Sequence, residues 1–439
     1  MAAERRVALF QREWLMQSQT VNLVTSLLSR GFQVDVFLDH VVQRYDRLPP
    51  VDRTTGLRVT DFTPELSTAV IHTNEETGIA VLKNRVRSNL APDSLQYRLY
   101  FLAGEAKQQA RASMEWLRHA TRRSDLSYLL PNELQKRTWE QMQGYTYCAL
   151  IGVERTGLVW AGAMAERAAA PLIYFSLELY TNDFLHDPLG NGVRIRCLNR
   201  MEAHYHRQSQ ATIIQDTARA QVLLQDNGVD HTRLLFLPVS LLGPTQREKS
   251  DLLHRMLSLP AEQRLLLMFG KIASRRFVPN LVQIAQSFPE NWTLVIHDGG
   301  ASSYSVDMLK AEDRQGRVAV STALVPPSEL PTLISSADVG LVFYAADTQN
   351  EYLTGRSSEK AAQYARAGVP MIAFNYPSFL EVFDEYHCGL GISTLNRINE
   401  AAACIFANYA FFQQGAWRAY EEVYEFSRHF QAIADWLEA

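Results

Sequence analysis

Short runs of apolar residues alternate with longer segments of helical spacing along most of the chain. The first apolar run, at residues 7–10, is followed by a helical segment ending at Arg30-Gly31, and a second run begins at Val34. This order of strand, helix, glycine and strand is typical of a parallel βαβ unit. Further strands in the first half of the chain are predicted at residues 148–153, 171–176 and 211–216.

The same rhythm begins again after Pro238. Five more strands, separated by helical segments, are predicted at residues 264–270, 293–299, 317–322, 338–344 and 370–374. The restart predicts two doubly wound α/β domains, with the linker near residues 238–245. Two such domains would face each other across a cleft lined by the carboxyl ends of both sheets, where open parallel sheets bind ligands.

Composition and charge exclude several other classes of protein. The 439 residues are 47% apolar and 21% charged, with a net charge of -4 and interspersed signs. These values fit an ordinary folded chain and give no basic patch for nucleic-acid binding. The four cysteines lack metal-ligand spacing, and no apolar run is long enough to cross a bilayer. With no signal-peptide pattern at the start, we expect a cytoplasmic protein.

The segment 353–379 contains a cluster of residues that favours anion binding. Arg356, Ser357 and Ser358 precede a helical run, and a Gly-Val-Pro turn then leads into an apolar strand. A serine at a helix start is typical of an N-cap, and the positive end of a helix attracts anions. Lys360 adds positive charge, whereas Glu359 could satisfy the helix dipole without a ligand. These residues alone leave both interpretations open.

A second candidate cluster follows the first strand of the second domain. Gly270 ends that strand, and Lys271 and Arg276 follow within one short loop. A glycine lets backbone approach a ligand, and two cations at this spacing can both reach an anion. A solvated basic turn is the alternative that the residues leave open.

The order of these motifs resembles the carboxyl-terminal domain of GT-B glycosyltransferases, especially the retaining group called glycosyltransferase family four. The similarity rests on residues 265–300, 325–344 and 357–374, about a third of the chain. It implies an α/β GT-B architecture, with an acceptor domain at 1–240 and a nucleotide-sugar donor domain at 246–410. It also implies that the aromatic helical tail at 411–439 packs back on the first domain.

The resemblance assigns donor-binding roles to several residues. Lys271 and Arg276 would neutralise the donor diphosphate, in the reverse of the family's usual order of arginine and lysine. The turn with Arg356, Ser357 and Ser358 would offer N–H groups to a phosphate. The resemblance also implies that Gly270 lets the backbone approach the donor, that the backbone at Leu324 holds the nucleobase, and that Gln363 bonds to the ribose.

Two departures from the family pattern affect recognition of the donor sugar. The family commonly carries two glutamates separated by seven residues, and these positions fall on Gly355 and Gln363 here. Glu351 and Glu359 have the same spacing but are displaced by one helical turn. The glycine pair that the family places after its first strand is also missing. The sequence therefore does not predict which sugar is bound.

Catalytic candidates in the first half are Glu154 and Glu178, which follow predicted strands. A carboxylate there could orient an acceptor hydroxyl or stabilise positive charge on the sugar ring. The alternative is that either residue caps a helix or pairs with a neighbouring arginine. No Asp-x-Asp pair suited to a metal on a diphosphate is found, so we expect metal-independent catalysis without a cofactor other than the donor.

The resemblance implies a hexosyltransferase-like enzyme that moves a sugar from a UDP- or GDP-sugar to an acceptor hydroxyl, with retention. The alternative is a nucleotide-sugar epimerase or a non-catalytic GT-B subunit that binds nucleotide-sugars. The acceptor class is left open between a sugar, a lipid-linked glycan and a small molecule. Basic and aromatic runs between residues 72 and 140 would suit peripheral contact with the inner membrane surface, or form an ordinary solvated helix.

Overall fold

The computed structural model describes residues 5–12, 18–40, 48–49, 54–63, 113–114, 116–117, 120, 124–180, 192–230, 232–270, 277–298, 306–326 and 328–439. The chain forms two compact units: unit 1 contains residues 1–236 and 430–439, and unit 2 contains residues 237–429. Lys271 and Arg276 lie outside the described residues, as does most of the predicted basic and aromatic stretch.

Unit 1 is built on a parallel sheet of seven strands in the order β3-β2-β1-β4-β5-β6-β7. The strands are β1 (Arg6–Gln11), β2 (Gln33–Leu38), β3 (Leu57–Asp61), β4 (Ala149–Val153), β5 (Leu172–Phe175), β6 (Ala211–Ile214) and β7 (Arg233–Phe236). The interior strands β4, β5 and β6 are buried throughout, as expected for a parallel sheet covered on both faces. The described helices are α1 (Ser18–Ser29), α5 (Asp125–Leu129), α6 (Asn132–Met142), α7 (Glu154–Ala168), α8 (Gly192–His206) and α9 (Thr217–Asn227).

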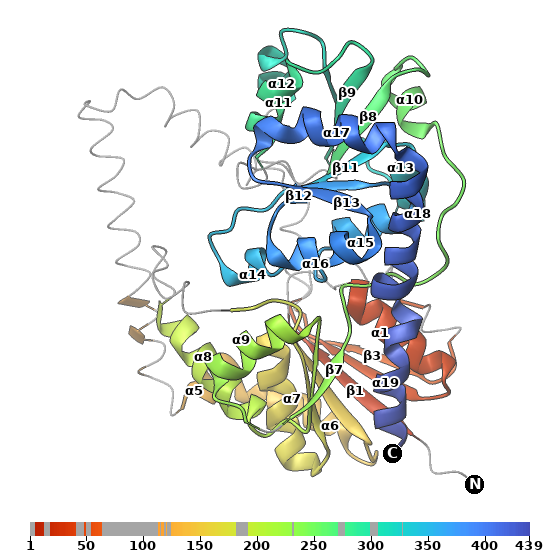
Figure 1. The fold of residues 1–439 in the computed structure, drawn as a ribbon. Coiled ribbons are helices and arrows are strands. Elements are labelled where there is room, and N and C mark those ends of the chain that lie inside the picture. Colours follow the sequence, from red (N-terminus) through yellow and green to blue (C-terminus); the bar gives the residue numbers. More distant parts are fainter. Residues whose placement is uncertain are drawn as a thin grey trace, which may run out of the picture. The chain divides into compact units, whose positions relative to one another are not determined.

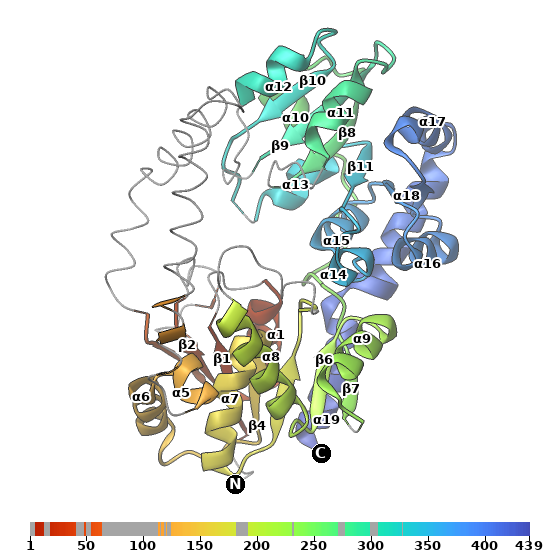
Figure 2. The same ribbon diagram turned by 90° about the vertical axis from the view of Figure 1, so that its left-hand side faces the viewer.

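Helix α7 packs unusually close to the strands beneath it. A Cβ added at Gly157 would lie 2.3 Å from the carbonyl oxygen of Phe10, so only glycine fits. Trp160, on the same helix, makes an edge contact with the Phe10 ring at 5.4 Å between centroids. Helices α7 and α8 lie side by side (Figure 2). This packing fixes the first turn of α7, which begins with Glu154, against the ends of β1 and β4.

Unit 2 is built on a parallel sheet of six strands in the order β10-β9-β8-β11-β12-β13. The strands are β8 (Arg264–Phe269), β9 (Trp292–His297), β10 (Val318–Ser321), β11 (Val339–Val342), β12 (Met371–Phe374) and β13 (Gly389–Ile392). Its helices are α10 (Leu252–Leu257), α11 (Val278–Ala285), α12 (Val306–Glu312), α13 (Leu330–Ser335), α14 (Gln349–Tyr352), α15 (Glu359–Arg366), α16 (Pro377–Tyr386), η5 (Leu395–Arg397), α17 (Ile398–Ala407), α18 (Tyr409–Ala419) and the π-helical turn η6 (Tyr420–Tyr424). The last helix, α19 (Phe426–Glu438), begins in unit 2 and ends in unit 1.

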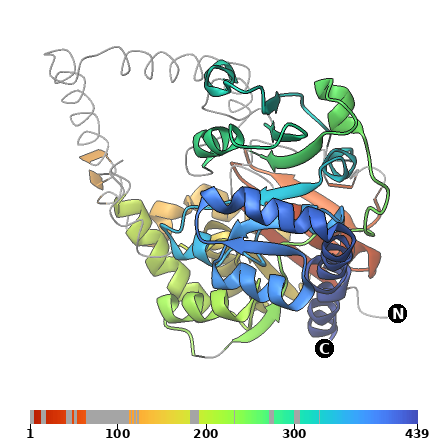
Figure 3. The same ribbon diagram turned by 45° about the horizontal axis from the view of Figure 1, so that its top comes forward.

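The unit 2 sheet separates two apolar cores. Along β8, Leu265 and Leu267 pack with residues of α13, α15 and α16, whereas Leu266 and Met268 pack with residues of α11 and α17. This alternation follows from the two-residue repeat of a strand. Figure 1 and Figure 3 show the result, with α16 and α17 on opposite sides of β12 and β13.

Both predicted α/β units are confirmed, but β3, β7 and β13 were not predicted from the sequence. All three are edge strands, and each carries exposed or half-buried positions along its length. The physical reason for the miss is that an edge strand has one neighbour and need not be continuously apolar.

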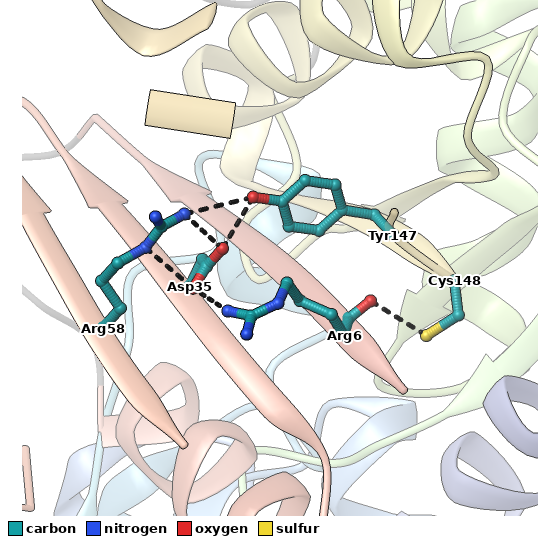
Figure 4. A network of polar contacts seen from close by, with 5 residues as sticks. All are labelled: Arg6, Asp35, Arg58, Tyr147 and Cys148. Atoms are coloured by element: carbon teal, nitrogen blue, oxygen red, sulfur yellow. Dashed lines mark hydrogen bonds and ion pairs between the residues drawn. The ribbon is translucent and has the colours of Figure 1, made fainter. Parts of the chain in front are cut away.

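A buried polar network joins the amino ends of the unit 1 strands (Figure 4). The carboxylate of Asp35, on β2, is 1% exposed and accepts from Arg6 Nη1 at 2.8 Å, Arg58 Nη2 at 2.6 Å and the Tyr147 hydroxyl at 2.6 Å. Burial and the bond to Asp35 raise the pKa of Tyr147. One carboxylate therefore ties β1, β2, β3 and the approach to β4 together at the edge opposite the strands' carboxyl ends.

We predict that Asp35→Ala lowers the free energy of unfolding by about 3 kcal/mol, because it leaves two guanidinium groups facing each other without their counter-charge. Urea unfolding followed by circular dichroism measures the change. Asp251→Ala is the matched control, since the Asp251 side chain is 70% exposed and its ion pair with Arg255 lies on a helix surface. Equal effects of the two substitutions would contradict a structural role for the Asp35 network.

Candidate active site

Gly270 directly follows β8, at the carboxyl edge of the unit 2 sheet. Its φ is +103°, a conformation that glycine adopts readily, and its N–H donates to the carbonyl of His297 at 2.9 Å. A Cβ added at Gly270 would lie 3.1 Å from Cε of Lys360. The predicted glycine turn and the first turn of α15 are therefore adjacent. Lys360, which was noted in the sequence only as a nearby charge, lies directly against this turn.

Ser358 is the N-cap of α15, as predicted. Its Oγ accepts from the N–H of Ala361 at 3.2 Å and shares a hydrogen bond with the hydroxyl of Tyr344 at 2.8 Å. The side chain is 1% exposed, and its hydroxyl caps the helix. Contact between a ligand and this part of the site would involve the positive end of the helix and Lys360.

Arg356 and Ser357 lie in the turn just before the cap. Arg356 Nη2 pairs with Glu381 at 3.1 Å, so part of its charge is already balanced within unit 2. The Ser357 N–H donates to the carbonyl of Thr354 at 3.1 Å, and the carbonyl of Arg356 accepts from the N–H of Val239 at 2.9 Å. The turn is consequently held by the chain on both sides and presents a fixed backbone.

Gln363 lies on α15 and is 7% exposed. Within the described part of the chain its Oε1 atom has no hydrogen-bond partner. An unsatisfied buried acceptor costs about 1–3 kcal/mol, so a ligand hydroxyl that donated here would relieve this cost. The Oδ1 atom of Asp298, which follows β9 and was not predicted, is also buried and lacks a partner among the described residues.

Leu324 lies in the loop after β10, and its side chain is 76% exposed. Strand β10 is at the sheet edge and is separated from β8 by β9, so Leu324 lies two strands away from Gly270. The predicted donor residues thus follow several different strands of one sheet edge. At this edge, Gly270 and Lys360 at the α15 start are in contact.

Gly355 occupies a position where no side chain fits. A Cβ there would lie 2.0 Å from the carbonyl oxygen of Ser378. The Gly355 N–H donates to Ser378 Oγ at 3.1 Å, and its carbonyl accepts from the Tyr424 hydroxyl at 2.8 Å. The missing carboxylate at this position is therefore a consequence of backbone packing. Glu351, on α14, and the exposed Glu359, in the first turn of α15, stay outside this contact.

In unit 1 the predicted pair Glu154 and Glu178 comes together after β4 and β5. Glu154 begins α7 with φ +59°, and its side chain is 1% exposed. Its Oε1 accepts from the N–H of Leu177 at 2.9 Å and from the N–H of Glu178 at 3.0 Å. Glu178 itself is exposed. One carboxylate thus holds the loop that carries the other.

Sequence reasoning missed Arg219, a completely buried arginine beside this loop. Its Nε donates to Gln215 Oε1 at 2.6 Å, and its Nη2 donates to the carbonyl of Leu177 at 2.9 Å. Burial lowers the pKa of Arg219, while the charges of Glu178, Asp216 and Glu154 act in the opposite direction. A weak signal existed, because Asp216 caps α9 and Arg219 lies in that helix's first turn, directly after β6.

No helix in the described part of the chain is long and apolar enough to cross a membrane. Among the same residues, no group of three or more histidine, cysteine, aspartate and glutamate side chains could hold a metal ion.

The sequence matches no protein-family model and no curated protein. The fold, in contrast, is similar to many solved structures. Sucrose-phosphate synthase from Thermosynechococcus elongatus is 12% identical, with a TM-score of 0.64 over 99% of this chain and 98% of that chain. HepE of Anabaena, in complex with UDP-glucose, is 12% identical, with a TM-score of 0.64 over 99% of both chains. A UDP-forming trehalose-phosphate synthase from Burkholderia vietnamiensis is 11% identical, with a TM-score of 0.57 over 99% of this chain and 100% of that chain.

Identities of 11–12% establish a shared fold and leave activity to be argued from the residues. The predicted fold class is confirmed, whereas membership of family four stays a prediction. The chain has the α/β architecture of GT-B glycosyltransferases, with two Rossmann-like units.

Proposed function

We propose that this protein is a glycosyltransferase that moves a sugar from a nucleotide-diphosphate donor to an acceptor hydroxyl. The observation that carries the proposal is the contact between the Gly270 turn and Lys360 at the start of α15. A left-handed glycine turn, a lysine and the positive end of a helix meet there, a combination suited to phosphate groups. Solved structures of the same fold hold UDP-glucose, UDP and glucose, which supports a nucleotide-sugar as the ligand.

In this proposal the donor binds to the domain at 246–410. Lys271 and Arg276 neutralise the diphosphate together with Lys360, so no metal ion is required. Gln363 pairs with a ribose hydroxyl through its buried Oε1 atom. Backbone near Leu324 holds the nucleobase, and UDP or GDP is the nucleotide portion.

The acceptor binds to the domain at 1–240, and the end of the tail, residues 430–439, completes it. The exposed Glu178 orients the acceptor hydroxyl or stabilises charge on the sugar ring, while the buried Glu154 holds its loop. The departing diphosphate takes the acceptor proton, and transfer proceeds with retention, as in family four. The acceptor is a sugar, a lipid-linked glycan or a small molecule, in the cytoplasm or at the inner membrane surface.

The packing at Gly355 favours a second candidate function. Because Ser378 leaves no room for a carboxylate that family four uses near the donor sugar, the chain would also suit a nucleotide-sugar epimerase or a non-catalytic subunit. Such a subunit would bind nucleotide-sugars and assist a partner enzyme.

A panel of UDP-, GDP- and ADP-sugars tests the proposal. For at least one donor we expect release of free nucleoside diphosphate, measured with and without EDTA. Turnover that survives EDTA supports phosphate neutralisation by Lys271, Arg276 and Lys360. Turnover that is lost in EDTA and restored by Mn²⁺ or Mg²⁺ would overturn metal independence, and a thermal shift without nucleotide release would favour the binding subunit.

We predict that Lys271→Ala and Arg276→Ala each weaken nucleoside-diphosphate binding by about tenfold or more. A charge-assisted bond to a phosphate contributes about 1.5–3 kcal/mol, and 1.4 kcal/mol corresponds to a factor of ten. Gln363→Ala should cost less, since only neutral bonds are lost. Isothermal titration calorimetry measures the three affinities, and Lys310→Ala on α12 serves as a control. Unchanged affinity in both cation variants, with the fold intact, would contradict the phosphate site. The start of α15 would then be an ordinary capped helix.

We also predict that Gly355→Ala weakens nucleotide binding by displacing the turn before α15. Its Cβ would lie 2.0 Å from Ser378 O, so one of the two backbones must move, at about 1–3 kcal/mol of stability. Gly192→Ala is the matched control, because its Cβ would meet only the flexible end of Arg196 at 3.3 Å. Calorimetry and thermal unfolding measure both effects. A Gly355→Ala variant with native stability and affinity would show that this contact does not shape the site.

A further inference from the structure

The loop after β5 is held more completely than a surface loop requires. All six backbone polar groups of Ser176, Leu177 and Glu178 have partners. The N–H of Ser176 donates to Ile213 O, and those of Leu177 and Glu178 donate to Glu154 Oε1. The carbonyls accept from Gln215 Nε2 at 2.7 Å, Arg219 Nη2 at 2.9 Å and Ser176 Oγ at 3.1 Å, in that order. We call this arrangement the 176–178 clamp.

The clamp draws on residues from both neighbouring strands. Glu154 follows β4 on one side of β5, and Gln215 and Arg219 follow β6 on the other side. Both charged members are 1% exposed. Burying an ion costs several kcal/mol unless its partners compensate, and apolar residues of similar volume would often stabilise a fold as well. Stability alone therefore does not explain why charges hold this loop.

The clamp leaves one side chain outside. Ser176, Leu177 and Leu179 are 0%, 5% and 2% exposed, whereas Glu178 between them is exposed. Among the carboxylates whose charge raises the pKa of Arg219, Glu178 has the largest effect. The arrangement thus fixes the backbone of one exposed carboxylate and places a buried cation near it, at the carboxyl edge where parallel sheets bind ligands.

We propose that Arg219 is a positioning residue for Glu178: together with Glu154 and Gln215 it fixes the 176–178 loop so that the Glu178 carboxylate meets the acceptor. The inference rests on the proposed glycosyl transfer. Arg219 acts through two routes, the bond to the Leu177 carbonyl and the attraction between the guanidinium and Glu178. A lysine keeps the second route but lacks the planar fork that serves Gln215 and Leu177 together.

The activity test is a double-mutant cycle on donor turnover. Arg219→Lys should lower kcat by about 10–100-fold, because small misplacements of a catalytic group have effects of this size, and should leave KM for the donor within about twofold. In a Glu178→Gln background the same substitution should change kcat by less than about threefold, since its target is gone. Independent, multiplying effects of the two substitutions would overturn the proposal.

A second measurement needs no turnover. Hydrogen exchange read by mass spectrometry should show faster exchange at Leu177 and Glu178 in Arg219→Lys than in the native protein. Arg207→Lys is the control, because Arg207 is exposed and its Nη1 donates to the carbonyl of Asn227 at 2.8 Å, away from the 176–178 loop. Unchanged exchange in Arg219→Lys would overturn the clamp even if activity fell.

A milder variant keeps the test decisive if Arg219→Lys fails to fold. Gln215→Glu retains an acceptor for Arg219 Nε and replaces the Nε2 amide that donates to Ser176 O by a carboxylate oxygen, which cannot donate. We expect it to fold, to raise exchange over residues 176–178 and to lower kcat with KM kept. Native exchange and native kcat in this variant would contradict the clamp. Absence of turnover with every donor in the native protein would count against the proposed function. The hydrogen-exchange measurements would still test the clamp, since they need no turnover.

Discussion

Parallel pairing of strands is the constraint on which the rest of the structure depends. Each strand of either sheet ends at the same edge, so residues that are far apart in the chain become neighbours there. In unit 2 this edge joins Gly270 to Lys360, ninety positions later, and in unit 1 it joins Glu154 to Leu177 and Arg219. The opposite edge of unit 1 carries the buried Asp35 network, which joins the amino ends of these strands.

Much of the fold was predictable because a parallel interior strand is a continuous apolar run. The segments around β1, β4, β8 and β12 were found in this way, and Ser358 was identified correctly as a helix cap. Three of the four edge strands, β3, β7 and β13, were not found, since partial exposure breaks the pattern. Gly270 could be identified from the sequence as a turn residue, because a glycine directly after a strand often adopts a positive φ or allows close approach of the backbone.

The clamp could not be predicted, and the reason is physical. Arg219 bonds to Leu177, forty-two positions earlier, and nothing in the local sequence distinguishes a buried arginine from a solvated one. The sequence also did not show that Glu154 is buried and accepts from two backbone N–H groups of this loop, while its catalytic role stays a prediction. For Gly355 the sequence revealed a missing carboxylate, and only the backbone of Ser378 explains why none can be accommodated.

The supports of the turn before α15 come from the two ends of unit 2. Val239 lies three residues inside its first boundary and donates to Arg356, and Tyr424 lies near its last boundary and donates to Gly355. Unit 2 should therefore be excised for separate expression by cutting at residues 236/237 and 429/430. A shorter fragment limited to 246–410 would retain the whole sheet yet lose both supports of the turn before α15.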